Sequence, residues 1–419
     1  MQEYQVSDDA DLIRKLILSG HVFLRIHEHA DRGILYKVKS LIGLRKTNDT
    51  ENEFSVVGPK IGFTEDLDTN LHLMRTQVNI PNLVIKEVTS GKISHSRIAI
   101  LYIDGLTNEQ IVATVEQRIK ALDFTVIFDS TQLDQLITDN SNTPFPLLLN
   151  TERRDRVTYS LIRGQVAVIS DGSPYFIIGP STLFDFFISP EDYYLPWVIG
   201  SFFRIIRIFG VIFSIIASSM YVAIMTFHYE VIPQDMLKPL IYSRLNVPFD
   251  PVLEVLFLEL IIEFVREAGA RLPSKIGQTL GIVGGIIVGT AAVEAALASN
   301  ILIIVVCLSA LASFTTPIYK MSNTIRFLRF PIILLAAYWG SLGIFIGVCF
   351  LLVHVTRLTS LGFPYMVPLF PFRPGDFSDS FIRSDYEKIT DRPGFLRTQH
   401  KKFYNPKPWK RQKEWDDDE

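Results

Sequence analysis

The stretch IFGVIFSIIASSMYVAIMTF, residues 208–227, decides the fold class, because none of its 20 residues is Asp, Glu, Lys or Arg. A helix of about 20 apolar residues is long enough to cross the hydrocarbon core of a bilayer. Three further stretches without these charged residues approach or exceed that length, at 276–293, 295–319 and 330–356. We therefore predict an integral membrane protein with an all-α, multi-span membrane domain over residues 196–356.

Residues 1–195 contain no comparable stretch, so we expect a soluble unit ahead of the first span. The acidic N-terminus has no hydrophobic region, which argues against a cleavable signal peptide. The 419-residue chain has a net charge of −3, so composition gives no reason to expect a nucleic-acid partner. Cys307 and Cys349 lie inside apolar stretches, where small buried side chains are expected rather than a disulfide or metal ligands.

The soluble part has the pattern of a mixed α/β domain, which we divide into subdomains 1–95 and 96–195. In the first subdomain, two strand-like segments flank Asp31-Arg32-Gly33, which suggests a hairpin. Further along, Leu67, Leu71, Met74 and Val78 recur with the period of a helix. The first subdomain is therefore expected to contain both strands and a helix.

The second subdomain begins with a βαβ pattern. Residues 97–103 and 124–128 are strand-like, and residues 107–121 between them have helical spacing, which predicts a parallel pair of strands. Residues 165–170 and 175–178 flank an Asp-Gly dipeptide typical of tight turns, so a hairpin is expected there. Tyr193, Tyr194 and Trp197 then mark a composition suited to the headgroup layer of a membrane.

An amphipathic helix is predicted over residues 251–268, between the first apolar run and the second. It carries Glu254, and Glu259, Glu263 and Glu267 fall within about 80° of one another on its surface. Carboxylates at membrane depth are costly and normally face a polar cavity, so copies around a symmetry axis could line a cation pore. A helix lying on the membrane surface with a solvated face is the alternative, and the residues leave both open.

Four glycines follow at intervals of four, namely Gly277, Gly281, Gly285 and Gly289. Such a stripe lets two membrane helices pack closely, in the same chain or between chains, so we expect a helix-packing seam. Glu294 stands near the end of this span, ahead of a Ser299-Asn300 break that predicts a helical hairpin. An ion site and a solvated or capping role are both open for Glu294.

Positive charges beside the spans predict the orientation. Arg204 and Arg207 precede the first run, which places the soluble part in the cytoplasm. If the acidic helix crosses the membrane, five spans agree with the distribution of positive charge in the short loops. If that helix is re-entrant, four spans are the alternative. The C-terminal tail, residues 357–419, is rich in Pro and charge, so we expect an extended segment. Its basic and aromatic residues suit an anionic inner leaflet, whereas five spans place it outside.

Several collinear blocks in both halves carry a family resemblance. They are GPKIGFTEDLDTNL at 58–71, LYIDGLTN at 101–108, TERRDRVTYSLIRGQVAVISDGSP at 151–174, SPEDYY at 189–194, VREAGARLPSKIGQTLGIVGG at 265–285, AAVEAAL at 291–297, ASFTTP at 312–317, IRFLRFP at 325–331 and GFPYMVPLFPFRPGD at 362–376. With these blocks the chain resembles the GerA family of spore germination proteins, the A subunits of germinant receptors. The resemblance covers about residues 12–376.

The resemblance implies a cytoplasmic α/β domain of two subdomains followed by a membrane domain in the inner membrane of the spore. It implies as partners a transporter-like B subunit and a lipoprotein C subunit, with the A subunit as a homo-oligomer that releases monovalent cations at the start of germination. It thereby favours the pore-lining interpretation of the acidic helix. Members usually carry a further stretch before residue 12, which implies a shortened first subdomain and leaves open an impaired paralogue.

Two functions from different classes remain in view. The first is an oligomeric cation channel of a nutrient-responsive receptor, and the second is a non-conducting scaffold that couples the B subunit to the cytoplasm. No nucleophile elbow, phosphate-binding loop, zinc spacing or paired catalytic set occurs in the sequence, so we expect no enzyme, no cofactor and no metal site. The resemblance does not identify the nutrient or the number of subunits.

Overall fold

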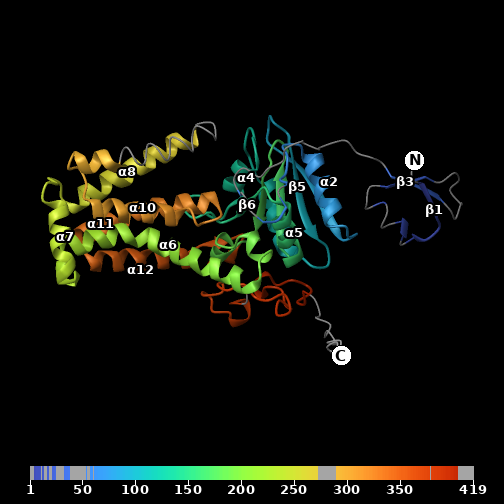
Figure 1. The fold of residues 1–419 in the computed structure, drawn as a ribbon. Helices are drawn as coiled ribbons and strands as arrows, with labels where there is room; N and C mark the ends of the chain where they lie inside the picture. Colours follow the sequence, from blue (N-terminus) through green and yellow to red (C-terminus); the bar gives the residue numbers. More distant parts are fainter. Residues whose placement is uncertain are drawn as a thin grey trace, which may run out of the picture.

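The structure is a computed structural model that describes residues 61–271, 289–377 and 379–403, together with residues 4–10, 12, 13, 17, 21–24, 33–37, 53 and 57–59. A mixed sheet-and-helix part comes first in the chain, and a part made of helices follows it (Figure 1). A small N-terminal sheet has the order β1-β3-β2, with β1 Tyr4–Ser7, β2 His21–Leu24 and β3 Gly33–Lys37. The antiparallel pairing of β2 with β3 confirms the predicted N-terminal hairpin.

The centre of the α/β unit is a five-stranded sheet in the order β4-β5-β7-β8-β6, in which all neighbours are antiparallel. Its strands are β4 Leu83–Ser90, β5 Ser96–Ile103, β6 Leu149–Thr151, β7 Val166–Ser170 and β8 Phe176–Gly179. The pairing of β7 with β8 confirms the hairpin predicted at the Asp-Gly dipeptide.

Helices cover both faces of this sheet. On one face, α2 Leu67–Gln77 and α5 Arg154–Arg163 share a core with Ala99 and Leu101 of β5. On the other face, α3 Glu109–Lys120 and α4 Ser130–Ile137 share a core with Ile98 and Ile100. Successive residues of a strand point to opposite faces, so the apolar run of β5 supplies both cores.

The parallel βαβ unit predicted from residues 97–128 is wrong. Residues 124–128 form no strand, and β5 pairs instead with β7 in antiparallel fashion. The backbone N–H groups of Lys92 and Ile93, in the turn after β4, donate to the carbonyls of Phe124 and Thr125. These bonds hold the segment beside the β4–β5 turn, and the chain then enters α4 on the same face as α3. Phe128 is exposed, so its apolar character is no sign of a buried strand.

A bundle of helices extends from one end of the α/β unit (Figure 1). It contains α6 Trp197–Thr226, α8 Pro251–Ala270, α10 Asn300–Ser313, α11 Tyr319–Trp339 and α12 Ser341–Arg357, with η3 Tyr229–Val231 and α7 Gln234–Arg244 at the end far from the sheet. Among the described residues, α6 alone has both the length and the apolar composition of a membrane crossing, while α10 and α12 are apolar but shorter. Most of the run 276–293 lies outside the described residues.

The chain enters the helical bundle through α6 and leaves it through α12, in both cases beside the α/β unit. The start of α6 follows η2 Pro190–Tyr193, which contacts α6 closely. The end of α12 leads to Thr359, whose hydroxyl donates to Asp139 of the α/β unit at 2.5 Å. Among the described residues, the chain thus enters and leaves the bundle at the end that adjoins the sheet.

The extended C-terminal segment that we expected is folded in its described part. It contains the two-stranded pair β9 Thr359–Ser360 and β10 Phe363–Pro364, then η4 Pro374–Phe377 and η5 Gly394–Leu396. Tyr365, Met366, Val367, Phe395 and Leu396 are buried in the two cores of the α/β unit. Burial of these side chains holds the segment against the sheet and outweighs its high content of Pro and charge.

Candidate functional site

Four of the five sequence-predicted carboxylates lie on α8, and their surroundings differ. Glu254 is fully buried, accepts a hydrogen bond from the backbone N–H of Ser299 at 2.5 Å and lies 3.4 Å from Arg244 Nε. These contacts join the start of α8 to the end of α7 and to the start of α10. Glu254 therefore lies inside the bundle of a single chain, at its far end.

Glu259 is the centre of a buried polar network. Its carboxylate forms an ion pair with Arg329 of α11 and accepts a hydrogen bond from Ser218 Oγ of α6 at 2.6 Å. Arg329 also donates from Nε to the carbonyl of Ser214 at 3.0 Å and from Nη2 to the carbonyl of Ser309 at 3.4 Å. Both charged side chains are 1% exposed. One ion pair thus joins α6, α8, α10 and α11.

The remaining predicted carboxylates are nearer the surface. Glu263 pairs with Arg266 at 2.6 Å and lies 3.5 Å from Arg326 Nε, so it connects α8 to α11 near the α/β unit. Glu267 is exposed and pairs with Arg271 at 2.6 Å, and Glu294 is exposed. Within one chain the five carboxylates therefore do not share one open face, since two of them point into the helix packing.

The glycine seam can be followed at one position only. Gly277, Gly281 and Gly285 lie outside the described residues. Gly289 has open space where a Cβ would lie, and it borders a cavity of about 460 Å³ between α8 and α10. Apolar side chains of both helices form most of this wall, together with Arg266 at one end.

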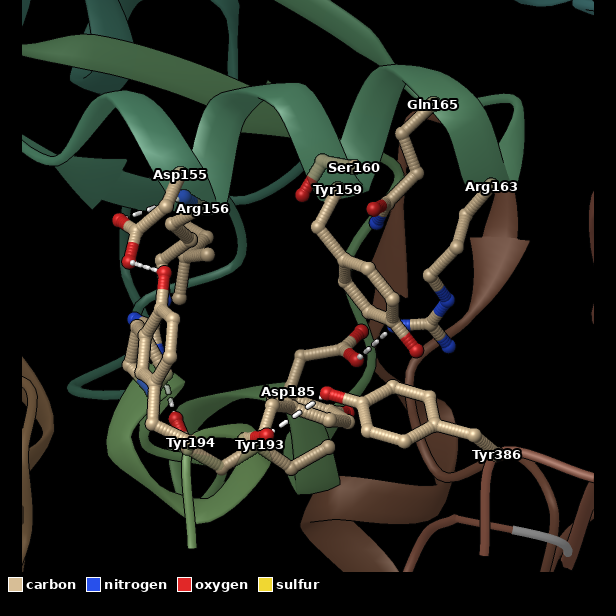
Figure 2. A pocket seen from close by; sticks show the side chains of 13 residues that line it. Asp155, Arg156, Tyr159, Ser160, Arg163, Gln165, Asp185, Tyr193, Tyr194 and Tyr386 are labelled. Carbon is tan, nitrogen blue, oxygen red and sulfur yellow. Dashed lines mark hydrogen bonds and ion pairs between the residues drawn. The ribbon is translucent and has the colours of Figure 1, made fainter. Parts of the chain in front are cut away.

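A second cavity, of about 220 Å³, lies where the α/β unit meets the helical bundle (Figure 2). Its walls come from α5, from η2 and from Tyr386 of the C-terminal segment. Arg156, Tyr159 and Arg163 project from α5 toward Tyr193 of η2 and Tyr194, which follows it. Three segments far apart in the sequence therefore meet around one polar and aromatic cavity.

Burial sets the protonation of the groups around this cavity. Burial, and then the Asp379 carboxylate, raise the pKa of Tyr159 to about 12, and burial raises the pKa of Tyr193 well above its ordinary value. Burial acts to lower the pKa of Arg163, but Asp185, Tyr159, Tyr193 and Asp379 together more than offset it and raise this pKa. The cavity therefore presents the neutral phenols of Tyr159 and Tyr193 and the charged guanidinium of Arg163 at neutral pH.

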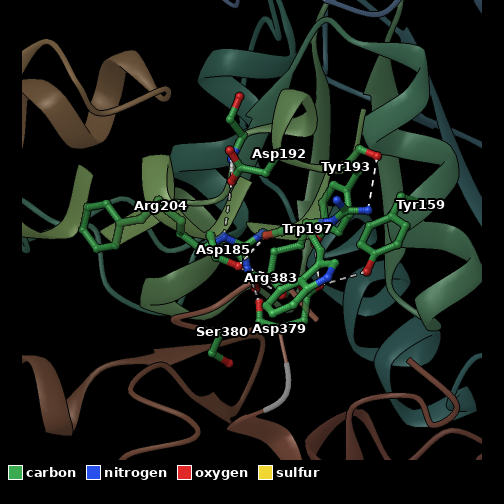
Figure 3. A network of polar contacts seen from close by, with 12 residues as sticks. Tyr159, Asp185, Asp192, Tyr193, Trp197, Arg204, Asp379, Ser380 and Arg383 are labelled. Carbon is green, nitrogen blue, oxygen red and sulfur yellow. Dashed lines mark hydrogen bonds and ion pairs between the residues drawn. The ribbon is translucent and has the colours of Figure 1, made fainter. Parts of the chain in front are cut away.

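A clasp of charged groups adjoins the cavity and ties the C-terminal segment to the start of α6 (Figure 3). Asp379 accepts hydrogen bonds from the hydroxyls of Tyr159 and Tyr193, and its Oδ1 lies 3.1 Å from Nη1 of Arg204. Arg204, on α6, is fully buried and also donates from Nε to Asp192 of η2 at 3.2 Å. We call the group formed by Tyr159, Asp192, Tyr193, Arg204 and Asp379 the Asp379 clasp.

The sequence did not predict the cavity or the clasp. Tyr193 was assigned to a membrane headgroup layer, whereas its hydroxyl donates to Asp379 inside the clasp. Arg204 was interpreted only as a topological signal, although it is an internal ion-pair partner. The available signal was the concentration of Arg, Asp and Tyr in the blocks TERRDRVTYSLIRG and SPEDYY. Among the described residues no group of three His, Cys, Asp or Glu could hold a metal ion.

Comparison with known proteins identifies the family. The family model described as the Bacillus/Clostridium GerA spore germination protein matches residues 1–395. The chain belongs to the GerA family. The resemblance inferred from the sequence blocks is thereby confirmed.

Individual GerA-family relatives agree with this assignment. The chain is 46% identical to the spore germination protein GerQA of Bacillus cereus over 402 residues, which cover 96% of this chain and 80% of that protein. It is 45% identical to GerIA of the same organism, also over 96% of this chain but over 60% of GerIA. It is 41% identical to the spore germination protein A1 of Bacillus subtilis over 81% of this chain and 70% of that protein. The similarity spans both the α/β unit and the bundle.

A solved structure also matches in sequence. The crystal structure of the N-terminal domain of the A subunit of the Bacillus megaterium spore germinant receptor GerK3 is 26% identical. The match covers 44% of this chain and 64% of that chain, with a TM-score of 0.33.

Proposed function

We propose that this GerA-family chain is the A subunit of a nutrient-responsive germinant receptor and that several copies form a cation channel. The channel opens at the start of germination in the inner spore membrane, where the chain acts beside a transporter-like B subunit and a lipoprotein C subunit. The α/β unit lies in the cytoplasm. The observation that carries the proposal is the row of carboxylates on α8, a helix of an otherwise apolar bundle.

The physical argument concerns the cost of these carboxylates. A charged side chain in an apolar helix is costly in a membrane, so a row of four is expected to serve ions rather than packing. Glu254 and Glu259 are buried and paired within the chain, Glu263 and Glu267 pair with Arg266 and Arg271 nearer the surface, and Glu294 is exposed. Copies arranged around an axis would bring these outer carboxylates into rings that attract monovalent cations. The glycines at 277, 281, 285 and 289 would form the packing seam.

Several helices of the bundle would cross the membrane in this proposal. The helix α6 is long enough alone, and α8, α10, α11 and α12 lie beside it in the same bundle. Because the chain path of the bundle starts and ends at the α/β unit, we propose the cytoplasmic side for the C-terminal segment as well. We therefore propose an even number of spans.

Potassium flux from liposomes tests the channel directly. The purified full chain is reconstituted, and wild type is compared with a Glu263→Gln, Glu267→Gln, Glu294→Gln variant at matched insertion. We expect the variant to lose cation preference and to conduct at least about tenfold less, because the outer rings lose their charge. Glu109→Gln, on the exposed surface of α3, is the control and should conduct like wild type. Equal flux and selectivity in all three proteins would remove the pore assignment.

A non-conducting coupling subunit is the second candidate. The observation in its favour is that Glu254 and Glu259 are paired with arginines of the same chain and that the Asp379 clasp joins the soluble part to α6. Co-reconstitution with the B and C subunits distinguishes the two functions. If the Glu263→Gln, Glu267→Gln, Glu294→Gln variant changes the conductance of the complex, the channel function of this chain is supported. If the complex conducts equally with the variant and with wild type, the coupling role is supported.

A further inference from the structure

We propose that the cavity between α5, η2 and the C-terminal segment binds a small organic carboxylate. The cavity has a volume of about 220 Å³ and lies outside the helical bundle that carries the predicted pore residues (Figure 2). The proposal concerns a ligand of the soluble part and does not rest on conduction. It goes beyond the channel function, because binding can be measured without ion flux.

The size of the cavity sets the size of the ligand. A water molecule in the liquid occupies about 30 Å³, so this space corresponds to several waters or to on the order of ten non-hydrogen atoms. Pockets for drug-sized ligands have volumes of about 300–1,000 Å³. This cavity is smaller, so a substituted benzene ring or a short-chain acid matches its size.

The charges of the wall favour an anion. Arg163 donates one hydrogen bond, from Nη1 to Asp185 Oδ1 at 3.2 Å. Within the part of the chain that the structure describes, its Nε and Nη2 make no hydrogen bond, so they remain available to a ligand. A guanidinium group offers a planar fork of donors that matches the two oxygens of a carboxylate.

Arg156 brings a second guanidinium to the wall of the cavity. It is 7% exposed, donates a hydrogen bond to the carbonyl of Ile188 and has Glu53 as an ion-pair partner at 3.7 Å. Because Arg156 lines the cavity, its positive charge would favour a carboxylate there at longer range.

The acids of the same wall already have partners. Asp155 accepts from Arg153 at 2.7 Å and from the hydroxyl of Tyr194 at 2.9 Å. Asp185 accepts from the backbone N–H of Thr182 at 2.8 Å in addition to Arg163. Their charges are thus met by groups of the protein. The unused donors of Arg163 make this wall a binding surface for an anion rather than for a cation.

Aromatic faces favour an organic anion over an inorganic one. The rings of Tyr159 and Tyr193 lie with centroids 5.0 Å apart, and Ile188 and Pro190 complete an apolar part of the wall. An aromatic or aliphatic body packs against these surfaces, and inorganic phosphate gains nothing from them. The ligand class is therefore a carboxylate with a small apolar body.

Benzoate and benzamide form a matched pair of probes, because they have the same shape and number of non-hydrogen atoms and differ in charge. Calorimetric titration of the purified full chain in detergent measures binding of each. We expect saturable binding of benzoate at least about tenfold tighter than that of benzamide or inorganic phosphate. Equal affinity for benzoate and benzamide, or no saturable binding of benzoate, would overturn the proposal.

Two variants test the position of the site. Arg163→Gln should weaken benzoate about tenfold or more, because the charged donors are lost. Ser160→Leu should abolish binding by filling the cavity, since Ser160 lines its wall. Arg97→Gln, on β5 and paired with Asp68 and Glu87, should bind like wild type. Unchanged affinity of Arg163→Gln for benzoate would contradict the assignment of the site to this cavity. If that variant does not fold, the Ser160→Leu variant and the comparison of benzoate with benzamide on wild type still test the proposal.

Discussion

The pair formed by Glu259 and Arg329 illustrates what a buried charge does in this bundle. Each side chain is almost completely buried, and together they hold hydrogen-bond partners on α6 and α10. Such a pair adds little net stability over apolar residues, but the loss of one partner leaves an uncompensated charge. The pair therefore fixes the relative position of four helices, and its two residues depend on each other.

Replacement of Glu259 alone should be severe. Glu259→Gln leaves the Arg329 guanidinium buried without its counter-ion, and we expect the free energy of unfolding to fall by about 3–5 kcal/mol. Addition of Arg329→Gln should recover most of this loss, because neither charge then remains. Glu267→Gln removes an exposed partner of Arg271 and should leave stability nearly unchanged. Denaturant titration in mild detergent measures all three, and a double variant no more stable than the single one would contradict the argument.

Tyr159 gives the α/β unit a dependence on alkaline pH. Its pKa is raised to about 12 by burial and by Asp379, against about 10 in an unfolded chain. A raised pKa means that the folded state holds the proton more tightly than the unfolded chain does. The contribution of Tyr159 to the free energy of unfolding is therefore complete below pH 10 and is lost as the pH rises toward 12. Tyr159→Phe should have a shallower loss of stability over that interval, measured by unfolding titrations at several pH values. If the free energy of unfolding falls equally with pH in both proteins, Tyr159 is not the source of the alkaline pH dependence.

At the scale of elements, helices with clear periods and hairpins with turn dipeptides could be predicted from the sequence. The 3.6-residue spacing of Leu67, Leu71 and Met74 corresponds to α2, and Asp171-Gly172 joins β7 to β8. The strand predicted at 124–128 failed because a short apolar run does not report its partner, and β7 takes the place beside β5. Sheet pairing depends on distant residues, so local patterns could not supply it.

The site was less predictable than the fold. The carboxylates of α8 were found because charges in an apolar helix stand out, but their arginine partners lie up to 70 residues away in the chain. The Asp379 clasp joins residues 175 positions apart, from a segment whose composition suggested an extended chain. Contacts of this kind follow from the packed fold and leave no periodic signal in the sequence.

The contact between α11 and α12 depends on a glycine at the crossing. A Cβ on Gly343 would lie 2.0 Å from the backbone oxygen of Leu335, so no side chain fits without separating the two helices. Gly343→Ala should lower the free energy of unfolding by about 1–3 kcal/mol. Gly375→Ala is the control, because nothing lies within 4 Å of a Cβ there. Thermal unfolding of both variants checks this, and equal midpoints would show that the helices can separate without cost.

At the scale of the whole molecule, the C-terminal segment is part of the α/β unit. Leu396 and Val367 are buried in the same core as α3 and α4, and Arg383 donates to the carbonyl of Leu195 just before α6. If the bundle crosses a membrane, we expect a segment packed in this way to lie on the same side as the sheet. The α/β unit, the start of α6 and the C-terminal segment therefore form one body at one end of the bundle, and α7 marks the other end.

Cysteine labelling tests this arrangement in vesicles. In a Cys307→Ser, Cys349→Ser background, single cysteines replace the exposed residues Asp123 of the α/β unit, Lys401 of the C-terminal segment and Glu230 of η3. A membrane-impermeant maleimide should label positions 123 and 401 from the same side and position 230 only from the other, because an even number of passages returns the chain to its starting side. Labelling of 401 together with 230 would mean an odd number of crossings and would separate the C-terminal segment from the sheet. That outcome would also remove Tyr386 from the cavity between α5, η2 and the C-terminal segment. The same experiment therefore tests whether the body that forms this cavity exists in the membrane.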